Sequence, residues 1–288
     1  QKMRKHLETD RQILWVTYYR NLYNATHPSE INSPVSLSRN LLAWNQPGTN
    51  GLILPVNPSA SFLSILFANE LWFTLGDMTM AEHCAMLSMI FSPRNSGSRM
   101  IKRLAEINLV NGDDEAALKY LRILDKTLLH KSWAEKRIPG QQTPRVKEWL
   151  EKKRRDIPTQ DQLRSGNDAV TSLQNLVASN AGNLRAYEYL LCYHLLSKDL
   201  RSFVEDYVPG KVSSPIFAEA LLIHLARQGN IRAEELIKYQ IPVEIAKEFA
   251  DYTRLYEAKD TSLKEKYGKT YWFYYHFATT EPGKESKP

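Results

Sequence analysis

Cysteine and glycine are both scarce in this chain of 288 residues, which contains two cysteines and 12 glycines. Two cysteines cannot form the disulfide framework of a small secreted domain, and Cys84 and Cys192 each lie in a strongly apolar stretch. We therefore predict that both are buried core thiols. Buried thiols do not indicate whether the protein is in an oxidising or a reducing compartment. The low glycine content argues against a turn-rich β-sandwich, and no convincing period-2 alternation of apolar residues occurs. The expected fold class is all-α.

Long apolar runs are also absent. The most apolar run, residues 62–75, is shorter than the roughly 20 residues of a membrane-spanning helix and contains Asn69 and Glu70. The basic start of the chain leads into charged residues without the apolar core of a signal peptide. Because the chain begins at Gln1, we expect membrane spans in a missing upstream segment of a longer protein. We expect the domain to face the periplasm, with the cytoplasm as the alternative.

Sequence motifs that carry catalysis are missing as well. No Gly-x-Gly-x-x-Gly, Walker phosphate loop or Gly-x-Ser-x-Gly elbow occurs. Glu82-His83 begins like a zinc motif, but Leu87 stands where the second histidine is needed. His194 and His224 lie in apolar stripes, which is typical of buried neutral histidines. We therefore expect no catalytic residue, metal site or cofactor here, and leave open the activity of any upstream region.

A repeat is the most informative feature that is present. Gly76-Asp77 is followed by Ala81, and 36 residues later Gly112-Asp113 is followed by Ala117. Repeats of 20 to 50 residues indicate stacked helical hairpins, none of which buries its own apolar face alone. We predict that both glycines end helices and that both alanines lie at close helix crossings. The expected architecture is an α-α superhelix.

Helical periodicity and turn residues place the expected elements. A second repeat relates Tyr187–Leu195 to Phe217–Leu225, each an apolar stripe with a histidine at the same site. The expected helices are 59–75, 78–91, 99–111, 113–130, 144–156, 243–257 and 263–278, after a first hairpin over 10–45. The expected regions are N-terminal hairpin repeats over 1–138, a basic linker helix region over 139–182, C-terminal repeats with an aromatic terminal helix over 183–280, and a disordered tail over 281–288.

Positive charge is concentrated in one segment, residues 131–155, while the whole chain has a formal net charge of +6. Its basic residues are Lys131, Lys136, Arg137, Arg145, Lys147, Lys152, Lys153, Arg154 and Arg155. Such a segment attracts phosphates or anionic lipid. A solvated helix that bridges two halves of the protein is the alternative explanation.

The Gly-Asp turns resemble those of tetratricopeptide repeats. That family places Gly-Asp at the hairpin turn, a small residue at the closest helix crossing and a proline after the second helix. Residues that match are Gly76, Asp77, Ala81 and Pro93 in one hairpin, and Leu104, Ala105, Gly112, Asp113, Ala117 and Leu121 in the next. Ala85, Asn108 and Leu129 depart from the pattern. The resemblance implies a tetratricopeptide-like helical hairpin solenoid.

Three longer segments resemble an uncharacterised family of Bacteroides-type membrane proteins with a soluble C-terminal helical part. The segments are 70–83, 102–113 and 267–275. The resemblance implies membrane attachment upstream of this chain, but it brings no activity and no functional residue.

The expected function is a non-catalytic domain for protein or peptide interaction or scaffolding. Asn69, Asn108 and Asn111 are candidates for binding a partner's backbone, although asparagines also cap helix ends. Arg94, Ser96, Ser98 and Arg99 form a candidate anion-binding loop before a helix. One alternative is an accessory domain of an enzyme or transporter whose active part lies upstream. The other is a binder of anionic lipid or nucleic acid through residues 131–155, with nucleic acid the less expected ligand.

Overall fold

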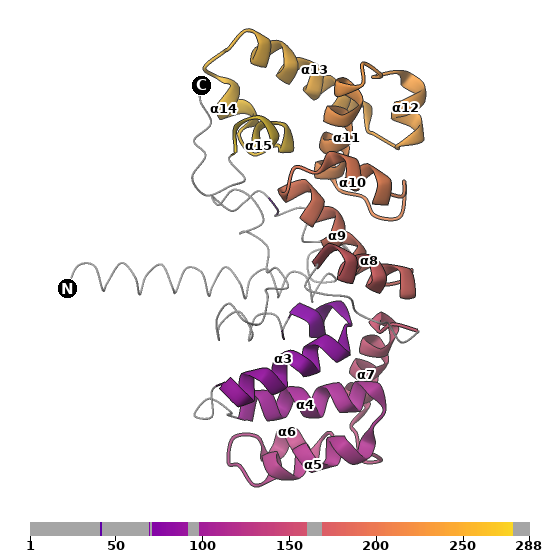
Figure 1. Ribbon diagram of the computed structural model, residues 1–288, viewed down its shortest axis with the longest axis vertical. Helices are drawn as coiled ribbons and strands as arrows, with labels where there is room; N and C mark the ends of the chain where they lie inside the picture. Colours follow the sequence, from indigo (N-terminus) through magenta and orange to yellow (C-terminus); the bar gives the residue numbers. More distant parts are fainter. Residues whose placement is uncertain (1–40, 42–68, 70, 92–97, 160–168, 279–288) are drawn as a thin grey trace, which may run out of the picture. The chain divides into compact units, whose positions relative to one another are not determined.

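A computed structural model describes residues 41, 69, 71–91, 98–159 and 169–278 of the chain. Within these ranges all regular secondary structure is helical, which confirms the all-α prediction (Figure 1). The expected hairpin over 10–45, apart from residue 41, and the tail over 281–288 lie outside the described residues. The described residues from 69 onward divide into two compact units between Ala186 and Tyr187. We call them the N-terminal unit and the C-terminal unit, and a superhelical path through both stays a prediction.

The N-terminal unit starts, in its described part, with helical residues 71–75. Its further helices are α3 (Met78–Phe91), α4 (Ser98–Asn111), α5 (Asp114–Asp125), α6 (Lys131–Glu135), α7 (Pro144–Asp156) and α8 (Ala169–Ser179). Helix α9 (Leu184–Leu196) leads into the C-terminal unit, which contains α10 (Leu200–Asp206), α11 (Pro215–Arg227), α12 (Ala233–Lys238), α13 (Val243–Glu257), α14 (Leu263–Tyr267) and α15 (Tyr271–Phe277).

Both Gly-Asp pairs form the predicted hairpin turns. Gly76 has φ +92° and Gly112 has φ +82°, a left-handed conformation that glycine adopts without a steric penalty. The Asp113 N–H donates to the Asn108 carbonyl at 2.9 Å, which closes the turn after α4. The Asp113 carboxylate then accepts the Ala116 N–H at 2.9 Å and caps α5. One dipeptide therefore ends one helix and starts the next.

The two repeat alanines are fully buried, as predicted for close helix crossings. Ala81 and Ala117 have no exposed surface. Ala117 is on α5, which packs along α4. One cluster of buried residues joins α4, α5 and α6 through Ala105, Leu121, Leu124 and Ala134. The predicted core thiols Cys84 and Cys192 are also fully buried.

Helix α5 ends five residues earlier than predicted. The side-chain hydroxyl of Thr127 donates to the Leu124 carbonyl at 2.7 Å and accepts the His130 N–H at 3.3 Å. These bonds stabilise a turn where the apolar spacing predicts a further helical turn. As a result, Leu128 does not join the buried stripe of Leu121 and Leu124, and its side chain is 101% exposed.

The last turn of α7 binds the C-terminal ends of two other helices. Arg154 donates from Nη2 to the Leu109 carbonyl at 2.8 Å and from Nε to the Val110 carbonyl at 3.0 Å. Lys153 donates to the Phe73 carbonyl at 3.2 Å. Cations are favourable there because the last carbonyls of a helix carry partial negative charge and lack intrahelical donors. Helix α7, from the predicted basic linker helix region over 139–182, thus packs against α4 within the N-terminal unit.

The C-terminal unit packs its aromatic residues around Trp272. Trp272 is fully buried, and its indole N–H donates to the Glu219 carbonyl on α11 at 3.0 Å. The expected single helix over 263–278 is interrupted, because the Thr270 side chain accepts the Phe273 N–H at the start of α15. His194 is buried 2.8 Å from Asp206, as expected of a histidine with a hydrogen-bonded nitrogen, whereas His224 is half-buried.

The raised pKa of Glu219 should make the stability of the C-terminal unit depend on pH. Burial raises the pKa of Glu219 to about 7, and the nearby Glu248 raises it further, while the hydrogen bond from the Tyr271 N–H lowers it. Because the folded pKa lies above that of an unfolded glutamate, the folded state holds a proton that the unfolded state has lost. Stability should therefore fall by up to about 3 kcal/mol between about pH 4.5 and pH 7.

Glu219→Gln removes this ionisation and should flatten the decline. The measurement is the free energy of unfolding from denaturant titrations at about pH 5 and about pH 8. Glu257→Gln, which changes an exposed carboxylate at the end of α13, should keep the dependence of the unchanged chain. Equal pH dependence in both variants would contradict the assignment to Glu219.

Candidate functional site: a basic cleft with two tryptophans

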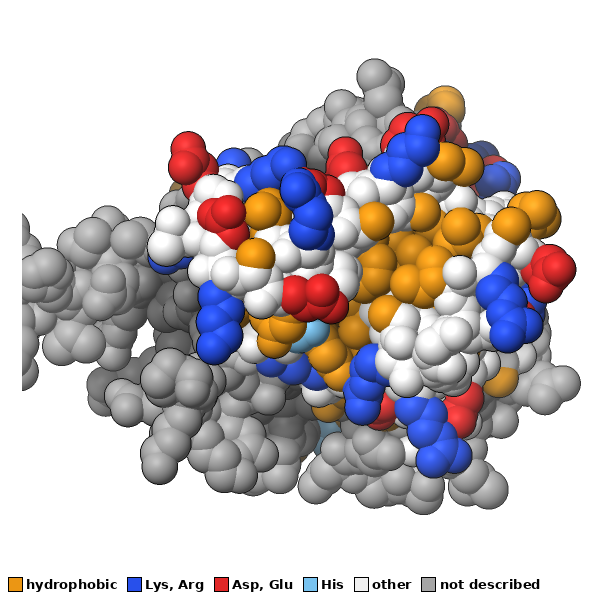
Figure 2. All heavy atoms as spheres, turned by 90° about the horizontal axis from the view of Figure 1, so that it is seen from above, with side chains coloured by type: hydrophobic (Ala, Val, Ile, Leu, Met, Phe, Trp, Pro, Cys, Tyr) orange, Lys and Arg blue, Asp and Glu red, His pale blue; other side chains and the backbone are white. Residues whose placement is uncertain are grey.

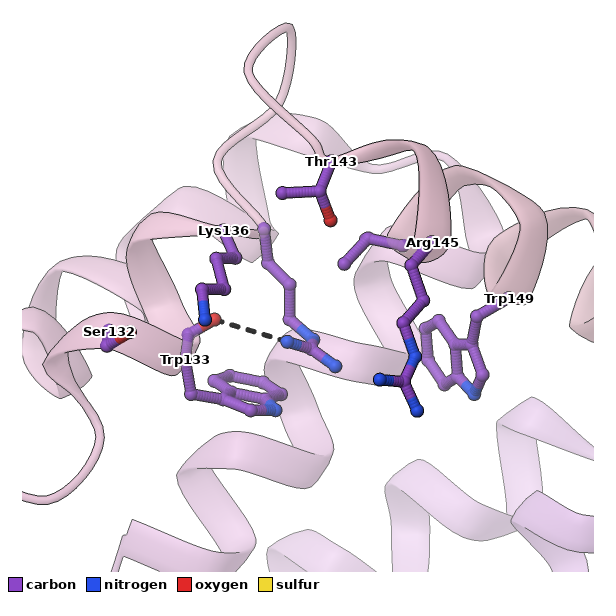
Figure 3. A pocket seen from close by; sticks show the side chains of 8 residues that line it. Ser132, Trp133, Lys136, Thr143, Arg145 and Trp149 are labelled. Carbon is purple, nitrogen blue, oxygen red and sulfur yellow. Dashed lines mark hydrogen bonds between the residues drawn. The ribbon is translucent and has the colours of Figure 1, made fainter.

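Two helical Trp/Arg pairs face each other in the N-terminal unit. Trp133 and Arg137 are four residues apart on and just after α6, and Arg145 and Trp149 are four residues apart on α7. Residues four apart lie on the same side of a helix. The intervening turn ends at Thr143, and Pro144 at the first position of α7 fixes where the second pair begins. The pairs therefore have opposite order along the chain and border one cleft (Figure 3).

Arg137 connects the two tryptophans. Its guanidinium carbon lies 4.1 Å from the centre of the Trp133 ring and 5.9 Å from that of Trp149. Its Nη1 donates to the Trp133 carbonyl at 3.2 Å, the bond drawn in Figure 3. Burial lowers the pKa of Arg137 and the charge of Glu106 raises it. The carboxylate of Glu106 bonds Arg103 at 3.1 Å, so the positive charge of Arg137 is held mainly against aromatic rings.

Behind Trp149, a second layer of rings and cations supports the cleft. The Trp149 ring stacks on Phe73 with ring centres 6.3 Å apart. Arg103 lies 3.7 Å from the centre of the Phe73 ring, and Lys153 lies 4.5 Å from it. Burial, with the charges of Arg185 and Arg103, lowers the pKa of Lys153 to about 7. Phe73, with Arg103 and Lys153 against its ring, therefore supports the Trp149 wall of the cleft.

The cleft has a volume of about 600 Å³, within the range of small-ligand sites. Its lining residues are Ser132, Trp133, Lys136, Arg137, Thr143, Arg145, Val146 and Trp149, and none of them is acidic. Lys136 and Arg145 are exposed, whereas both tryptophans are partly buried. Such a cleft can bind an anionic group beside an apolar or aromatic one.

The sequence indicates a basic segment over 131–155 but not this cleft. The sequence signal for the cleft is the paired spacing Trp133-x-x-x-Arg137 and Arg145-x-x-x-Trp149. Each spacing places one tryptophan and one arginine on the same side of a helical segment. Lys153 and Arg154 come from the same segment but bind helix ends. The segment therefore has two roles that charge counting does not separate.

The three candidate asparagines do not form one exposed surface. Asn69 is fully buried and donates to the Ala81 carbonyl at 2.6 Å. Asn108 is 7% exposed and donates to the Leu104 carbonyl one helical turn earlier, at 2.7 Å. Asn111 is exposed at the end of α4. The sequence predicts that these asparagines contact a partner's backbone. In the structure, the amides of Asn69 and Asn108 instead form hydrogen bonds within their own unit.

In the candidate anion-binding loop, Arg94 and Ser96 lie outside the described residues. Ser98 is the first residue of α4 and is half-buried, and Arg99 is exposed. Across the described ranges, the structure has no group of three or more potential metal ligands. His83 is exposed on α3.

The C-terminal unit presents a second surface, which is apolar. Figure 2 is viewed onto its α13–α14 end and shows hydrophobic side chains gathered in a hollowed area among charged side chains of both signs. The large exposed apolar residues of the unit are Val208, Ile231, Ile237, Val243, Tyr256 and Phe277. Exposed apolar area of this kind is common where proteins bind one another.

Comparison with known proteins identifies a family but no activity. No described helix is both long and apolar enough to cross a membrane. No curated protein and no solved structure matches the chain. One family model matches residues 33–278, most of the chain, and it describes a family of unknown function, DUF6057. The match is consistent with the expectation that the family is uncharacterised, and the chain belongs to DUF6057.

Proposed function

We propose that this chain is a protein-interaction domain that binds an acidic peptide segment of a partner in the cleft between Trp133 and Trp149. The observation that carries the proposal is the composition of the cleft lining, with two indole rings, three cations and no carboxylate. A bound carboxylate would form charge-assisted hydrogen bonds with Arg145 and Lys136. An apolar or aromatic side chain next to it would pack on the indoles.

A peptide fits the cleft better than a nucleic acid does. Nucleic-acid binding needs an extended basic surface that neutralises many phosphates. Of the nine basic residues over 131–155, Lys153 and Arg154 bond main-chain carbonyls of their own unit, three line the cleft of about 600 Å³, and the other four lie outside its lining. That space suits a few side chains. Attachment of a longer parent protein to a membrane stays a prediction that rests on the sequence resemblance.

Replacement of Arg145 by glutamate should weaken binding of an acidic peptide at least about tenfold, since hydrogen bonds to charged groups contribute about 1.5–3 kcal/mol. The probe is a peptide of alternating glutamate and phenylalanine, titrated by calorimetry or tryptophan fluorescence. The same peptide with glutamine for glutamate should bind far more weakly. Lys147→Glu is the matched control, because Lys147 is exposed on the same helix and outside the lining.

Equal losses in Arg145→Glu and Lys147→Glu would show a general charge effect and reject the cleft as the site. Trp149→Ala should also weaken binding, since it removes one wall of the cleft. Tighter binding of a single-stranded oligonucleotide than of the acidic peptide, with a steep salt dependence, would favour the nucleic-acid alternative.

A further inference from the structure

The turn between α5 and α6 exposes two adjacent leucines. Leu128 is 101% exposed and Leu129 is 89% exposed, the highest values among the large apolar residues that the structure describes. Single apolar side chains on a surface need no explanation. Two consecutive leucines that extend fully into solvent are different, because neither gains the free energy that burial of an apolar side chain provides.

The turn holds these leucines in place through its own hydrogen bonds. Thr127 bonds the Leu124 carbonyl and the His130 N–H through its hydroxyl, at 2.7 and 3.3 Å. The Lys131 N–H donates to the Thr127 carbonyl at 3.1 Å. The leucines therefore form a convex tip on an ordered turn between two packed helices.

Exposed basic residues flank the tip in the sequence. Arg122, Lys126 and Lys131 are exposed on either side of it, and Asp125 is the one exposed carboxylate between them. Lys131 lies 4.0 Å from Glu135 across one turn of α6, a distance at which a solvent-exposed pair neutralises little. An apolar tip with cations at its base matches an anionic bilayer surface, where leucines enter the acyl region and lysines reach the headgroups.

We propose that the turn over residues 126–131 is a membrane-docking tip that inserts Leu128 and Leu129 into an anionic lipid surface. A protein groove is a poorer match, because a stable protein interface buries about 1,200 Å² or more and two side chains supply a small part of that. Lipid adapts to a small convex tip without a preformed partner surface. The tip is separate from the cleft, so this proposal does not rest on the proposed peptide binding.

The first test is co-sedimentation of the full chain with vesicles. Phosphatidylcholine mixed with an equal amount of phosphatidylglycerol should bind the protein, and phosphatidylcholine alone should bind it far more weakly. Leu128→Ser with Leu129→Ser should lower the partition coefficient at least about tenfold. Lys126→Glu with Lys131→Glu should also lower it. Ile237→Ser, which removes an apolar side chain that is 76% exposed on the other unit, is the matched control.

Unchanged binding of the double serine variant would overturn the proposal, as would equal binding to both kinds of vesicle. A loss of binding in Arg145→Glu but not in the double serine variant would assign lipid binding to the cleft instead. Circular dichroism checks that each variant is folded, which is expected because both leucines are exposed.

The second test measures insertion directly. Both native cysteines are fully buried, so Leu128→Cys supplies an accessible thiol for an environment-sensitive fluorophore. The label at position 128 should shift its emission to shorter wavelength on anionic vesicles, whereas a label at Ile237→Cys should not. No shift at 128, or the same shift at both positions, would contradict insertion of the tip.

Discussion

Gly76→Ala should destabilise the N-terminal unit far more than Gly112→Ala, although both glycines occupy the same turn of the repeat. Each has positive φ, so an alanine at either site meets the left-handed penalty of about 1–2 kcal/mol. At Gly112 a Cβ atom would have nothing within 4 Å. At Gly76 it would lie 2.2 Å from the Asp156 carbonyl oxygen, which belongs to the backbone at the end of α7.

This backbone contact cannot be relieved by rotation of a side chain. Asp156 is held by Asn183, whose amide donates to the carbonyls of Asp156 and Leu75 at 2.8 and 2.7 Å. Arg185 also bonds the Asp156 carboxylate at 2.6 Å. Alanine at position 76 must therefore displace the end of α7, a cost of about 1–3 kcal/mol beyond the left-handed penalty.

The measurement is the free energy of unfolding of both variants from denaturant titrations. We expect a loss of about 1–2 kcal/mol for Gly112→Ala and of roughly 2–5 kcal/mol for Gly76→Ala. Similar losses would mean that Gly76 does not approach α7 as closely as the structure places it. Asn183→Ala gives an independent check, because it frees the carbonyls of Leu75 and Asp156 and should also be strongly destabilising.

Trp272→Ala should cost about 3–5 kcal/mol in the C-terminal unit, the usual range for a buried tryptophan. The ring is fully buried, with its centre 5.3 Å from that of Phe249 and 5.5 Å from that of Tyr252. Its removal leaves a large cavity between α13 and α15 and deprives the Glu219 carbonyl of its indole donor. Thermal or denaturant unfolding measures the loss.

Two variants separate packing from hydrogen bonding at this site. Trp272→Phe keeps an aromatic ring but leaves the Glu219 carbonyl without the indole N–H, so an intermediate loss of about 1–3 kcal/mol is expected. Phe277→Ala is the control on the same helix, because Phe277 is 45% exposed and should cost less than either change at Trp272. A larger loss for Phe277→Ala would show that Trp272 is not the centre of this core.

The hairpin turns show how local hydrogen bonding made part of the fold predictable. Gly76-Asp77 and Gly112-Asp113 contain both the left-handed residue and the capping carboxylate, so the turns follow from residues a few positions apart. In the C-terminal unit, the turn after α9 uses the same chemistry without glycine, whereas the turn after α11 has Gly229 at φ +62°. Lys198 has φ +57°, and Asp199 caps α10 by accepting the Ser202 N–H at 3.0 Å.

The candidate site was only partly predictable, because its geometry depends on contacts between distant residues and not on local hydrogen bonds. The basic segment over 131–155 is visible in the sequence, but the division of its cations between a cleft and helix ends is not. Arg154 reaches carbonyls 44 and 45 residues away, and Arg137 is enclosed by rings from both α6 and α7. Asn69 and Asn108 resemble surface residues in sequence, yet packing buries both.

The sequence alone determined the all-α class, the Gly-Asp turns, the bounds of α3, α7 and α13, and the burial of both cysteines. These features depend on apolar periodicity, caps and turn residues, all of which act over about one or two helical turns. Apolar periodicity did not reveal where α5 ends or that Leu128 is exposed, because local bonds of Thr127 to Leu124 and His130 end the helix there. Only the tertiary structure decided which cations face a cleft and which bind helix ends. That division depends on contacts between residues far apart in the chain, and periodicity in a single segment carries no information about its distant partners.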